Sequence, residues 1–294
     1  SLAQDDRSGG ADEEAVVGLG GADGSVRCLD GAGRPRWSFT AGGPVNSVAF
    51  ADLDGDGRLA VIAGSDDRRC YALHPDGRER WHFEGEAGDD PYWSRYWKAG
   101  EVEKVLAADL DGDGRMEVLF AAANMNVHAC SPDGQRLWRY RQYGICSSLV
   151  TADLEGTGRR AVLAGPATIT CVSTCALIDA AGKVLSTFGN DGWSSALTAL
   201  AVVDLDGSGR PVAACGTNKN NLYALTASAG KLAQRWKASI GDVVTCLAAA
   251  RLDGTPKEQV VVGSASDYVY VLDGAGAILW RANLHEVVQA VWAG

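Results

Sequence analysis

One segment recurs along the chain and constrains its fold more than any other feature. Five copies begin VNSVAFADLDGDGR, VEKVLAADLDGDGR, CSSLVTADLEGTGR, LTALAVVDLDGSGR and VTCLAAARLDGTPK. Each copy continues with two further apolar runs and ends in a run that usually carries tryptophan. Four short β-type runs separated by glycine turns are typical of one β-propeller blade. The sequence therefore predicts an all-β repeat fold.

The two ends of the chain predict a sixth blade. The N-terminal part supplies three strand-like runs without a first strand, and the C-terminal VVQAVWAG reads as a first strand without a blade after it. We therefore expect a single domain, 1–294, with four antiparallel strands per blade and a ring closed by the C-terminal inner strand joining the three N-terminal strands, which removes open edges. The expected blades cover 44–84, 101–141, 145–188, 195–238, 243–282, and 287–294 together with 14–40.

Two columns of the repeat carry distinctive side chains. Six residues before each loop stands a polar residue, which we expect to face the central channel and to bind either water or a ligand there: Asn46, Glu103, Ser147, Thr198, Thr245 and Gln289. Five of the nine tryptophans share one position on the outer strand, and we expect them to pack between blades: Trp37, Trp81, Trp138, Trp236 and Trp280.

The DLDGDG-type loops have the residues of calcium sites. Carboxylates at loop positions 1, 3 and 5, a carbonyl at position 7 and a carboxylate at position 9 can converge on one Ca²⁺ ion. The second loop satisfies all five positions, whereas Ala60 stands at position 9 of the first, and Arg251 at position 1 of the fifth. The alternative is a set of tight turns whose acids cap local N–H groups without metal. The expected ligands are Asp109, Asp111, Asp113, Arg115 and Glu117, then Asp52, Asp54, Asp56 and Arg58, then Asp153, Glu155 and Thr157, and finally Asp204, Asp206 and Ser208.

These loops resemble the FG-GAP or VCBS repeats of integrin α-like propellers, and YALHPDGRERW resembles quinoprotein-like repeats. The resemblance implies a calcium-stabilised propeller that is secreted or exposed at the cell surface. Such repeats occur in adhesion modules, lectins and polysaccharide lyases alike, so the resemblance implies fold far more than function.

An aromatic cluster, PYWSRYW, lies in the longest link between two repeats. Connections in an antiparallel blade alternate between its two ends, so this link falls on the face opposite the calcium loops. Aromatic faces with arginine, asparagine and acid groups suit sugar rings or protein side chains. The alternative is a loop that packs on itself. The expected ligand-binding residues are Tyr92, Trp93, Arg95, Tyr96, Trp97, Tyr143, Asn190, Asp191, Trp193 and His285.

Composition excludes several partners. The net charge is -10 with a sequence pI of about 4.9, which disfavours nucleic acid because phosphate binding needs clustered Lys and Arg. No apolar run has the roughly 18 residues of a membrane-spanning helix, so we expect no membrane insertion, and we expect a monomer. The eight cysteines include no C-x-x-C pair and are interpreted mainly as buried thiols.

Three functions fit these observations. The first is a calcium-stabilised, non-catalytic module that binds a glycan or a protein. The second is an enzyme resembling rhamnogalacturonan lyases, in which Arg95 neutralises a uronate and His285 or a tyrosine abstracts a proton. The third is a structural domain of a larger protein. The sequence favours a non-enzyme, since no catalytic motif such as G-x-S-x-G or H-E-x-x-H occurs.

Overall fold

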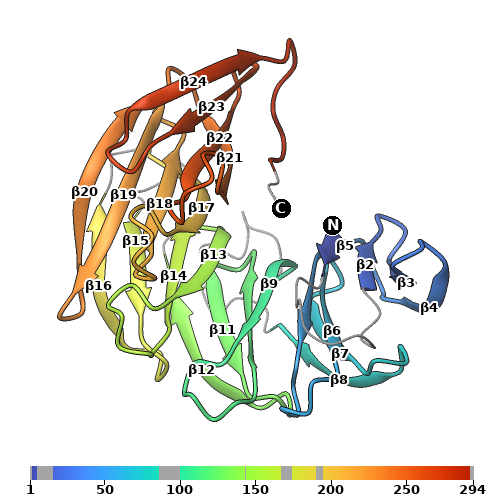
Figure 1. Cartoon of the computed structure of the whole chain (residues 1–294). Coiled ribbons are helices and arrows are strands. Elements are labelled where there is room, and N and C mark those ends of the chain that lie inside the picture. The colour runs from blue at the N-terminus through green and yellow to red at the C-terminus, as the bar shows by residue number, and fades with distance from the viewer. Residues whose placement is uncertain are drawn as a thin grey trace. The chain divides into compact units, whose positions relative to one another are not determined.

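The structure is a computed structural model, and it describes residues 2–4, 16–85, 100–142, 144–166, 174–189 and 195–291. In these residues the regular structure is entirely β, and it forms six sheets of four strands, each in chain order (Figure 1). This confirms the predicted all-β fold and its six blades. Among the described residues, no helix is long and apolar enough to span a membrane.

The chain divides into two units, Ser1–Cys146 and Ser147–Gly294. The first unit holds three sheets. Their strands are β1 (Leu2–Gln4), β2 (Val16–Gly20), β3 (Ser25–Asp30) and β4 (Pro35–Thr40), then β5 (Val45–Ala51), β6 (Ala60–Ser65), β7 (Arg69–Leu73) and β8 (Glu79–Glu84), then β9 (Val102–Ala108), β10 (Glu117–Ala122), β11 (Asn126–Cys130) and β12 (Arg136–Arg141).

The second unit holds the other three sheets. Their strands are β13 (Cys146–Ala152), β14 (Ala161–Pro166), β15 (Thr174–Ile178) and β16 (Val184–Gly189), then β17 (Leu197–Val203), β18 (Val212–Thr217), β19 (Asn221–Ser228) and β20 (Lys231–Ser239), then β21 (Val244–Ala250), β22 (Gln259–Ser264), β23 (Tyr268–Leu272) and β24 (Ile278–Asn283). Five sheets begin and end close to the limits expected from the repeat. That the six sheets form a single domain stays a prediction.

Apolar cores lie between consecutive sheets of the same unit. The core between β5–β8 and β9–β12, for example, includes Ile62, Val102 and Phe120. The sheets approach closely because Gly64 lacks a side chain: a Cβ built at this position lies 2.6 Å from a methyl carbon of Val102. Comparable close approaches join Gly165 to Leu197 and Gly216 to Val244. The glycines of β6, β14 and β18 thus make room for the next inner strand, whereas β10 has no glycine.

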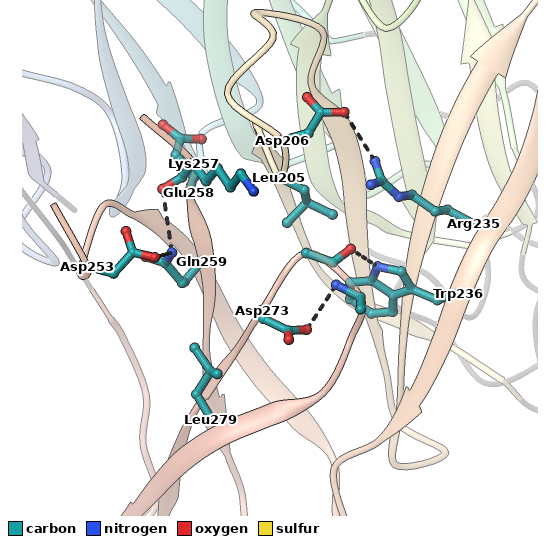
Figure 2. A pocket seen from close by; sticks show the side chains of 12 residues that line it. Leu205, Asp206, Arg235, Trp236, Asp253, Lys257, Glu258, Gln259, Asp273 and Leu279 are labelled. Atoms are coloured by element: carbon teal, nitrogen blue, oxygen red, sulfur yellow. Dashed lines mark hydrogen bonds and ion pairs between the residues drawn. The ribbon is translucent and has the colours of Figure 1, made fainter. Parts of the chain in front are cut away.

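Three of the five outer-strand tryptophans bond to the next sheet, as expected for residues that pack between blades. The indole N–H of Trp81 donates to the carbonyl of Pro132 at 2.9 Å, and that of Trp236 donates to Gly274 at 3.0 Å (Figure 2). Trp37 makes the same bond with Pro75 at 2.9 Å. Trp280, on the last sheet of its unit, has 49% of its surface exposed. Trp138, also on the last sheet of its unit, has only 9% of its surface exposed, so burial differs within this column.

The polar column of the inner strands also joins sheets. The amide of Asn46 donates to the carbonyl of Val102 at 3.1 Å and to Asp66 at 2.7 Å. The hydroxyl of Thr245 donates to the carbonyl of Val288. These two side chains thus bind backbone carbonyls of the segment that follows, where water or a ligand was expected.

One part of the expected architecture differs from the structure. The strand beside β2 is β1, with Leu2 opposite Leu19 and Gln4 opposite Val17, and not the C-terminal segment 287–294. The described C-terminal residues, up to 291, form no strand, and Val288 is held instead within its own unit, where its N–H donates to Ser264. β1 pairs with the free edge of β2. Because β1 lies near β2 in the sequence, the loop to be closed is shorter than it would be with the C-terminal segment.

Candidate calcium loops

The second loop, between β9 and β10, brings three carboxylates together. Carboxylate oxygens of Asp109, Asp111 and Glu117 all lie within 4.8 Å of one another. Ligand oxygens lie 2.3 to 2.6 Å from a bound Ca²⁺, so oxygens around one ion are at most about 5 Å apart. The spacing of this cluster therefore fits a calcium ion.

Hydrogen bonds fix the loop around this cluster. Asp109 accepts the N–H groups of Gly112 at 2.6 Å and Gly114 at 3.0 Å. Both glycines have positive φ, 84° and 88°, a conformation that residues with a Cβ rarely adopt. Asp113 accepts the N–H of Arg115 at 2.8 Å. The backbone path therefore explains why glycine stands at positions 4 and 6 of this loop. The acids of the loop also cap local N–H groups.

Glu117 begins strand β10 and is the most enclosed acid of the loop, with 4% of its surface exposed. One of its oxygens accepts the N–H of Leu110 at 2.8 Å. Burial raises the pKa of its carboxyl group, and the charges of Asp111 and Asp113 raise it further. A bound cation would offset both effects, since an opposite charge favours the ionised carboxylate. An environment that disfavours the ionised carboxylate of Glu117 is therefore, after the spacing of the oxygens, the second feature that fits a bound cation.

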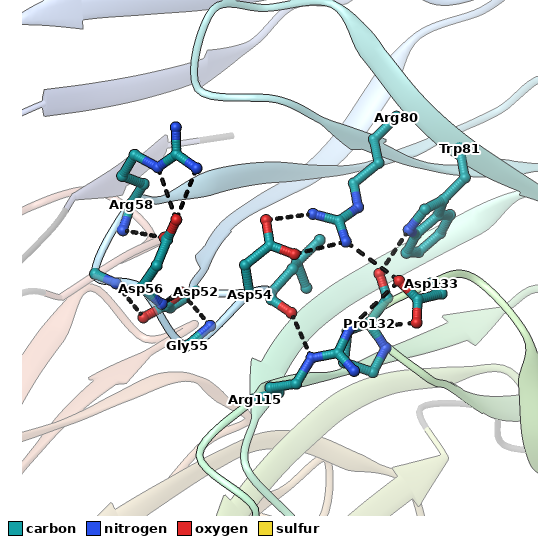
Figure 3. Close-up of polar contacts among 12 residues, drawn as sticks. Asp52, Asp54, Gly55, Asp56, Arg58, Arg80, Trp81, Arg115, Pro132 and Asp133 are labelled. Carbon is teal, nitrogen blue, oxygen red and sulfur yellow. Dashed lines mark hydrogen bonds and ion pairs between the residues drawn. The ribbon is translucent and has the colours of Figure 1, made fainter.

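The first loop uses its acids differently. Both oxygens of Asp54 bind the guanidinium of Arg80, at 2.7 and 2.8 Å (Figure 3). The hydrogen bonds of Arg80 lower the pKa of Asp54. Asp56 pairs with Arg58 at 2.7 Å, and Asp52 accepts the N–H groups of Gly55 and Gly57, both at 2.9 Å. The acids of this loop are thus paired as in a tight turn without metal, and calcium at this loop stays a prediction.

Two differences separate these loops: Ala60 stands in the first where Glu117 stands in the second, and β8 carries Arg80 where β12 carries Leu137. Arg80 directly precedes Trp81 and neutralises the position-3 acid of the first loop. In the next sheet the residue before Trp138 is Leu137, which has 52% of its surface exposed. No guanidinium from that position reaches Asp111. The residue before the tryptophan, Arg in RERW and Leu in QRLW, is the sequence signal for this distinction.

The third and fourth loops also hold their acids in local contacts. Asp153 accepts the N–H groups of Thr157 and Gly158, at 3.0 and 2.6 Å, and Glu155 accepts the N–H of Gly230 at 2.6 Å. Asp204 accepts the N–H groups of Gly207, Ser208 and Gly209 at 3.0, 3.2 and 2.8 Å. Asp206 lies 3.8 Å from Arg235. Calcium at these loops stays a prediction.

The fifth loop shows what replaces a cation. Gln259 stands where Glu117 stands in the second loop, and its side-chain oxygen likewise accepts the N–H of a leucine, Leu252, at 2.8 Å. Its amide nitrogen then donates to Asp253 at 3.1 Å. The neutral amide thus supplies a donor to the acid that corresponds to Asp111, and this loop needs no metal ion.

Most of the expected ligand-binding residues lie outside the described residues. They are Tyr92, Trp93, Arg95, Tyr96, Trp97, Tyr143, Asn190, Asp191 and Trp193. His285 is described: it is exposed, has φ 62°, and its backbone N–H donates to Asn283 at 2.7 Å. The structure thus places His285 in a turn after β24 and does not test the aromatic cluster.

Two buried amide side chains lie at the end of the sheet β9–β12 that carries the β10–β11 turn. Gln142 follows β12, and its backbone N–H donates to Met125 in the β10–β11 turn at 3.0 Å. Its side chain has 4% of its surface exposed, and neither amide atom has a hydrogen-bond partner among the described residues. The side-chain oxygen of Asn126 is unsatisfied in the same way. Neither residue was predicted as part of a site, because an isolated Asn or Gln in the sequence gives no signal of burial.

Comparisons with known proteins concern the fold. No family model and no curated protein matches the chain. Solved structures similar to it include Sqt1 of Saccharomyces cerevisiae (TM-score 0.72, 14% identity, covering 94% of this chain and 74% of that one). BamB of Moraxella catarrhalis has a TM-score of 0.61 and 16% identity and covers 99% and 78% of the two chains. BBS1N, solved in complex with ARL6DN, has a TM-score of 0.67 and 9% identity and covers 96% and 81%. These likenesses support the β-propeller fold.

Proposed function

We propose that this chain is a non-catalytic binding propeller. It binds one Ca²⁺ in the second loop as a structural staple and recognises a partner protein through the opposite end of its sheets. The observation that carries the recognition is the buried amide of Gln142, whose donor and acceptor are both unused among the described residues. Leaving such groups unsatisfied costs about 1 to 3 kcal/mol each, and a polar ligand can recover that cost.

A partner of this kind is supported by fold and position. BBS1N, a structure similar to this chain, was solved in complex with ARL6DN, so a propeller of similar fold has a protein partner. Gln142 also lies at the end of the sheet where β9 begins, because the start of β9, the β10–β11 turn and the segment after β12 share one end. A glycan is the other ligand class that these amides suit. Secretion or surface exposure and a monomeric state remain our expectations.

The lyase has no observation in its favour among the described residues. Arg95 lies outside them, and His285 is an exposed turn residue. Formation of unsaturated uronate, followed by ultraviolet absorbance on pectic substrates, tests this alternative directly.

The calcium part is tested by thermal unfolding with Ca²⁺, with Mg²⁺ and with EDTA. At 100 times the dissociation constant, a ligand of the folded state adds about 2.7 kcal/mol. Glu117→Gln should lose the calcium-dependent rise in melting temperature. Asp253→Asn is the matched control, since Asp253 already receives an amide donor from Gln259, and it should keep that rise. An equal calcium response in both variants would contradict the proposal.

The recognition part is tested on arrays of glycans and of displayed peptides. Gln142→Leu should abolish binding of any ligand found, whereas Gln135→Leu, the same change in the exposed β11–β12 turn, should not. Trp93→Ala with Trp97→Ala tests the aromatic cluster on the same arrays. Peptides that bind the control but not Gln142→Leu support a protein partner. Glycans with the same pattern would show that the ligand is a carbohydrate and not a protein. Hits that both Gln variants retain would overturn this face as the binding site.

A further inference from the structure

A cavity of about 670 Å³ lies between the fourth loop and the last sheet of the second unit. Leu205 and Asp206 of the loop, Arg235 and Trp236 of β20, and Lys257 of the fifth loop line it. In Figure 2, Lys257 and Arg235 point toward each other from opposite sides. The volume falls within the usual range of small-molecule sites. This cavity lies at the calcium-loop end and is independent of the proposed recognition face.

The repeat supplies a filled counterpart of this cavity in the first unit. There Arg80 binds both Asp54, at 2.7 Å, and Asp133, at 3.3 Å. Arg115 reaches the same Asp133 at 3.3 Å and the carbonyl of Leu53 at 3.1 Å. Figure 3 shows the carboxylate of Asp133 between the two guanidinium groups. One carboxylate thus holds two cations between the sheets β5–β8 and β9–β12.

The second unit keeps the cations and lacks the carboxylate. Trp81 bonds to Pro132, and Trp236 bonds to Gly274, so the next residue in each turn is equivalent, Asp133 in one unit and Ala275 in the other. By the same alignment, Arg235 corresponds to Arg80, and Lys257, at loop position 7, corresponds to Arg115.

Both cations are poorly paired as a result. Arg235 has one long contact, 3.8 Å to Asp206. Arg80, by contrast, makes a bidentate pair of hydrogen bonds with Asp54. Among the residues that the structure describes, the ammonium of Lys257 makes no ion pair or hydrogen bond. A guanidinium and an ammonium facing one cavity favour an anion there.

Of the four acids that line the cavity, Asp206 is the one near Arg235, and the other three are engaged elsewhere. Asp253 accepts from Thr255 and Gln259. Asp273 accepts the N–H groups of Ala275 and Ala277, both at 2.9 Å. Glu258 accepts the N–H of Asp204 at 2.7 Å and lies 3.9 Å from Arg251. None of these three carboxylates binds Arg235 or Lys257 in the described structure.

We propose that this cavity binds a small ligand through a carboxylate that lies between Arg235 and Lys257, in the place that the side chain of Asp133 takes in the first unit. The body of the ligand lies against Leu205 and the exposed Leu279, which also lines the cavity. The carboxylate is supplied either by a free organic acid or by an acidic side chain of a short peptide.

Two matched pairs of probes test the ligand chemistry by isothermal titration. D-glucuronate is compared with D-glucose, and acetyl-Gly-Asp-Gly-amide with acetyl-Gly-Asn-Gly-amide, each at up to tens of millimolar at low salt. We expect at least one acid to bind and its neutral counterpart not to bind. Preference for glucuronate identifies a free acid as the source, and preference for the Asp peptide identifies a side chain. Absence of binding by both acids, or equal binding of acid and neutral probes, would overturn the proposal.

Three variants test the position. Lys257→Met and Arg235→Met each remove one charge-assisted hydrogen bond, which should weaken acid binding about tenfold. Ala275→Asp restores the carboxylate found at Asp133 and should abolish acid binding while the protein stays folded by circular dichroism. Lys219→Met, an exposed lysine outside the cavity, should bind as the unchanged chain does. Undiminished binding by a folded Ala275→Asp variant would place the ligand elsewhere.

Discussion

Gly134→Ala offers a sharp test of how the sheets are fastened. Gly134 has φ 82° in the β11–β12 turn, and a Cβ built there lies 2.8 Å from Cδ2 of Trp81. Gly33 occupies the same kind of turn between β3 and β4, with φ 79° and no heavy atom within 4 Å of its built Cβ. The two glycines therefore share the backbone requirement, and only Gly134 has an indole against it.

The expected magnitudes follow from this difference. An alanine in the left-handed region costs about 1 to 2 kcal/mol, and this is the whole cost expected for Gly33→Ala. Overpacking adds about 1 to 3 kcal/mol, so Gly134→Ala should cost about 2 to 5 kcal/mol. Equilibrium unfolding in urea, followed by circular dichroism, measures both costs from the midpoint shift and the slope.

A double-variant cycle separates the indole from the backbone. In a Trp81→Ala background the added methyl group meets no ring, so the cost of Gly134→Ala should fall to that of Gly33→Ala. Equal costs of the two alanine variants in the unchanged chain would refute the reasoning, and so would an undiminished cost of Gly134→Ala without Trp81.

Further predictions concern titration and thiol reactivity. Burial raises the pKa of Glu117, so its ionised form destabilises the metal-free fold above that pKa and has no effect below the unfolded value of about 4.3. In EDTA, Glu117→Gln should therefore raise the urea midpoint at pH 8 and leave it unchanged near pH 3, and a midpoint raised equally at both would contradict this. Arg80 lowers the pKa of Asp54, so the stability that Asp54 contributes is present above about pH 3.9 and is lost as pH falls through its folded pKa. Asp54→Asn should cost no more than about 1 kcal/mol at pH 7, since the side chain is 47% exposed, and nothing near pH 2; a cost that persists at pH 2 would show another cause. Burial raises the pKa of Cys130 to about 12, so iodoacetamide at pH 8 should modify the partly exposed Cys246 well before Cys130, as peptide mapping by mass spectrometry would show; equal rates would contradict the burial.

The repeat made most of this fold predictable. Alternating apolar residues before each DLDGDG-type loop, and a tryptophan on the outer strand of four of these five repeats, predicted the strands and several of the residues that join sheets. The indoles of Trp81 and Trp236 bond to the following turn in the same way, because equivalent residues meet equivalent neighbours. Periodic features of this kind are visible in the sequence.

Features that depend on single substitutions were not predictable in the same way. The ion pair of Arg80 with Asp54 joins residues 26 positions apart. Only the structure shows that this pair occupies the carboxylate at position 3 of the first loop. The strand beside β2 was assigned to the wrong end of the chain, because a three-residue strand such as β1 gives no periodic signal. Gln142 is buried by its tertiary surroundings, which its own sequence neighbourhood does not reveal.

The indole bonds also turn the chain into its own set of optical reporters. Trp37 bonds to the turn that holds Pro75, Trp81 to the turn that holds Pro132, and Trp236 to the turn that holds Gly274. Each indole sits on one sheet but owes its environment to the sheet that follows. The emission of each tryptophan, isolated by replacing the others with phenylalanine, would therefore follow the docking of the next sheet, so that the order in which the sheets separate could be followed one interface at a time.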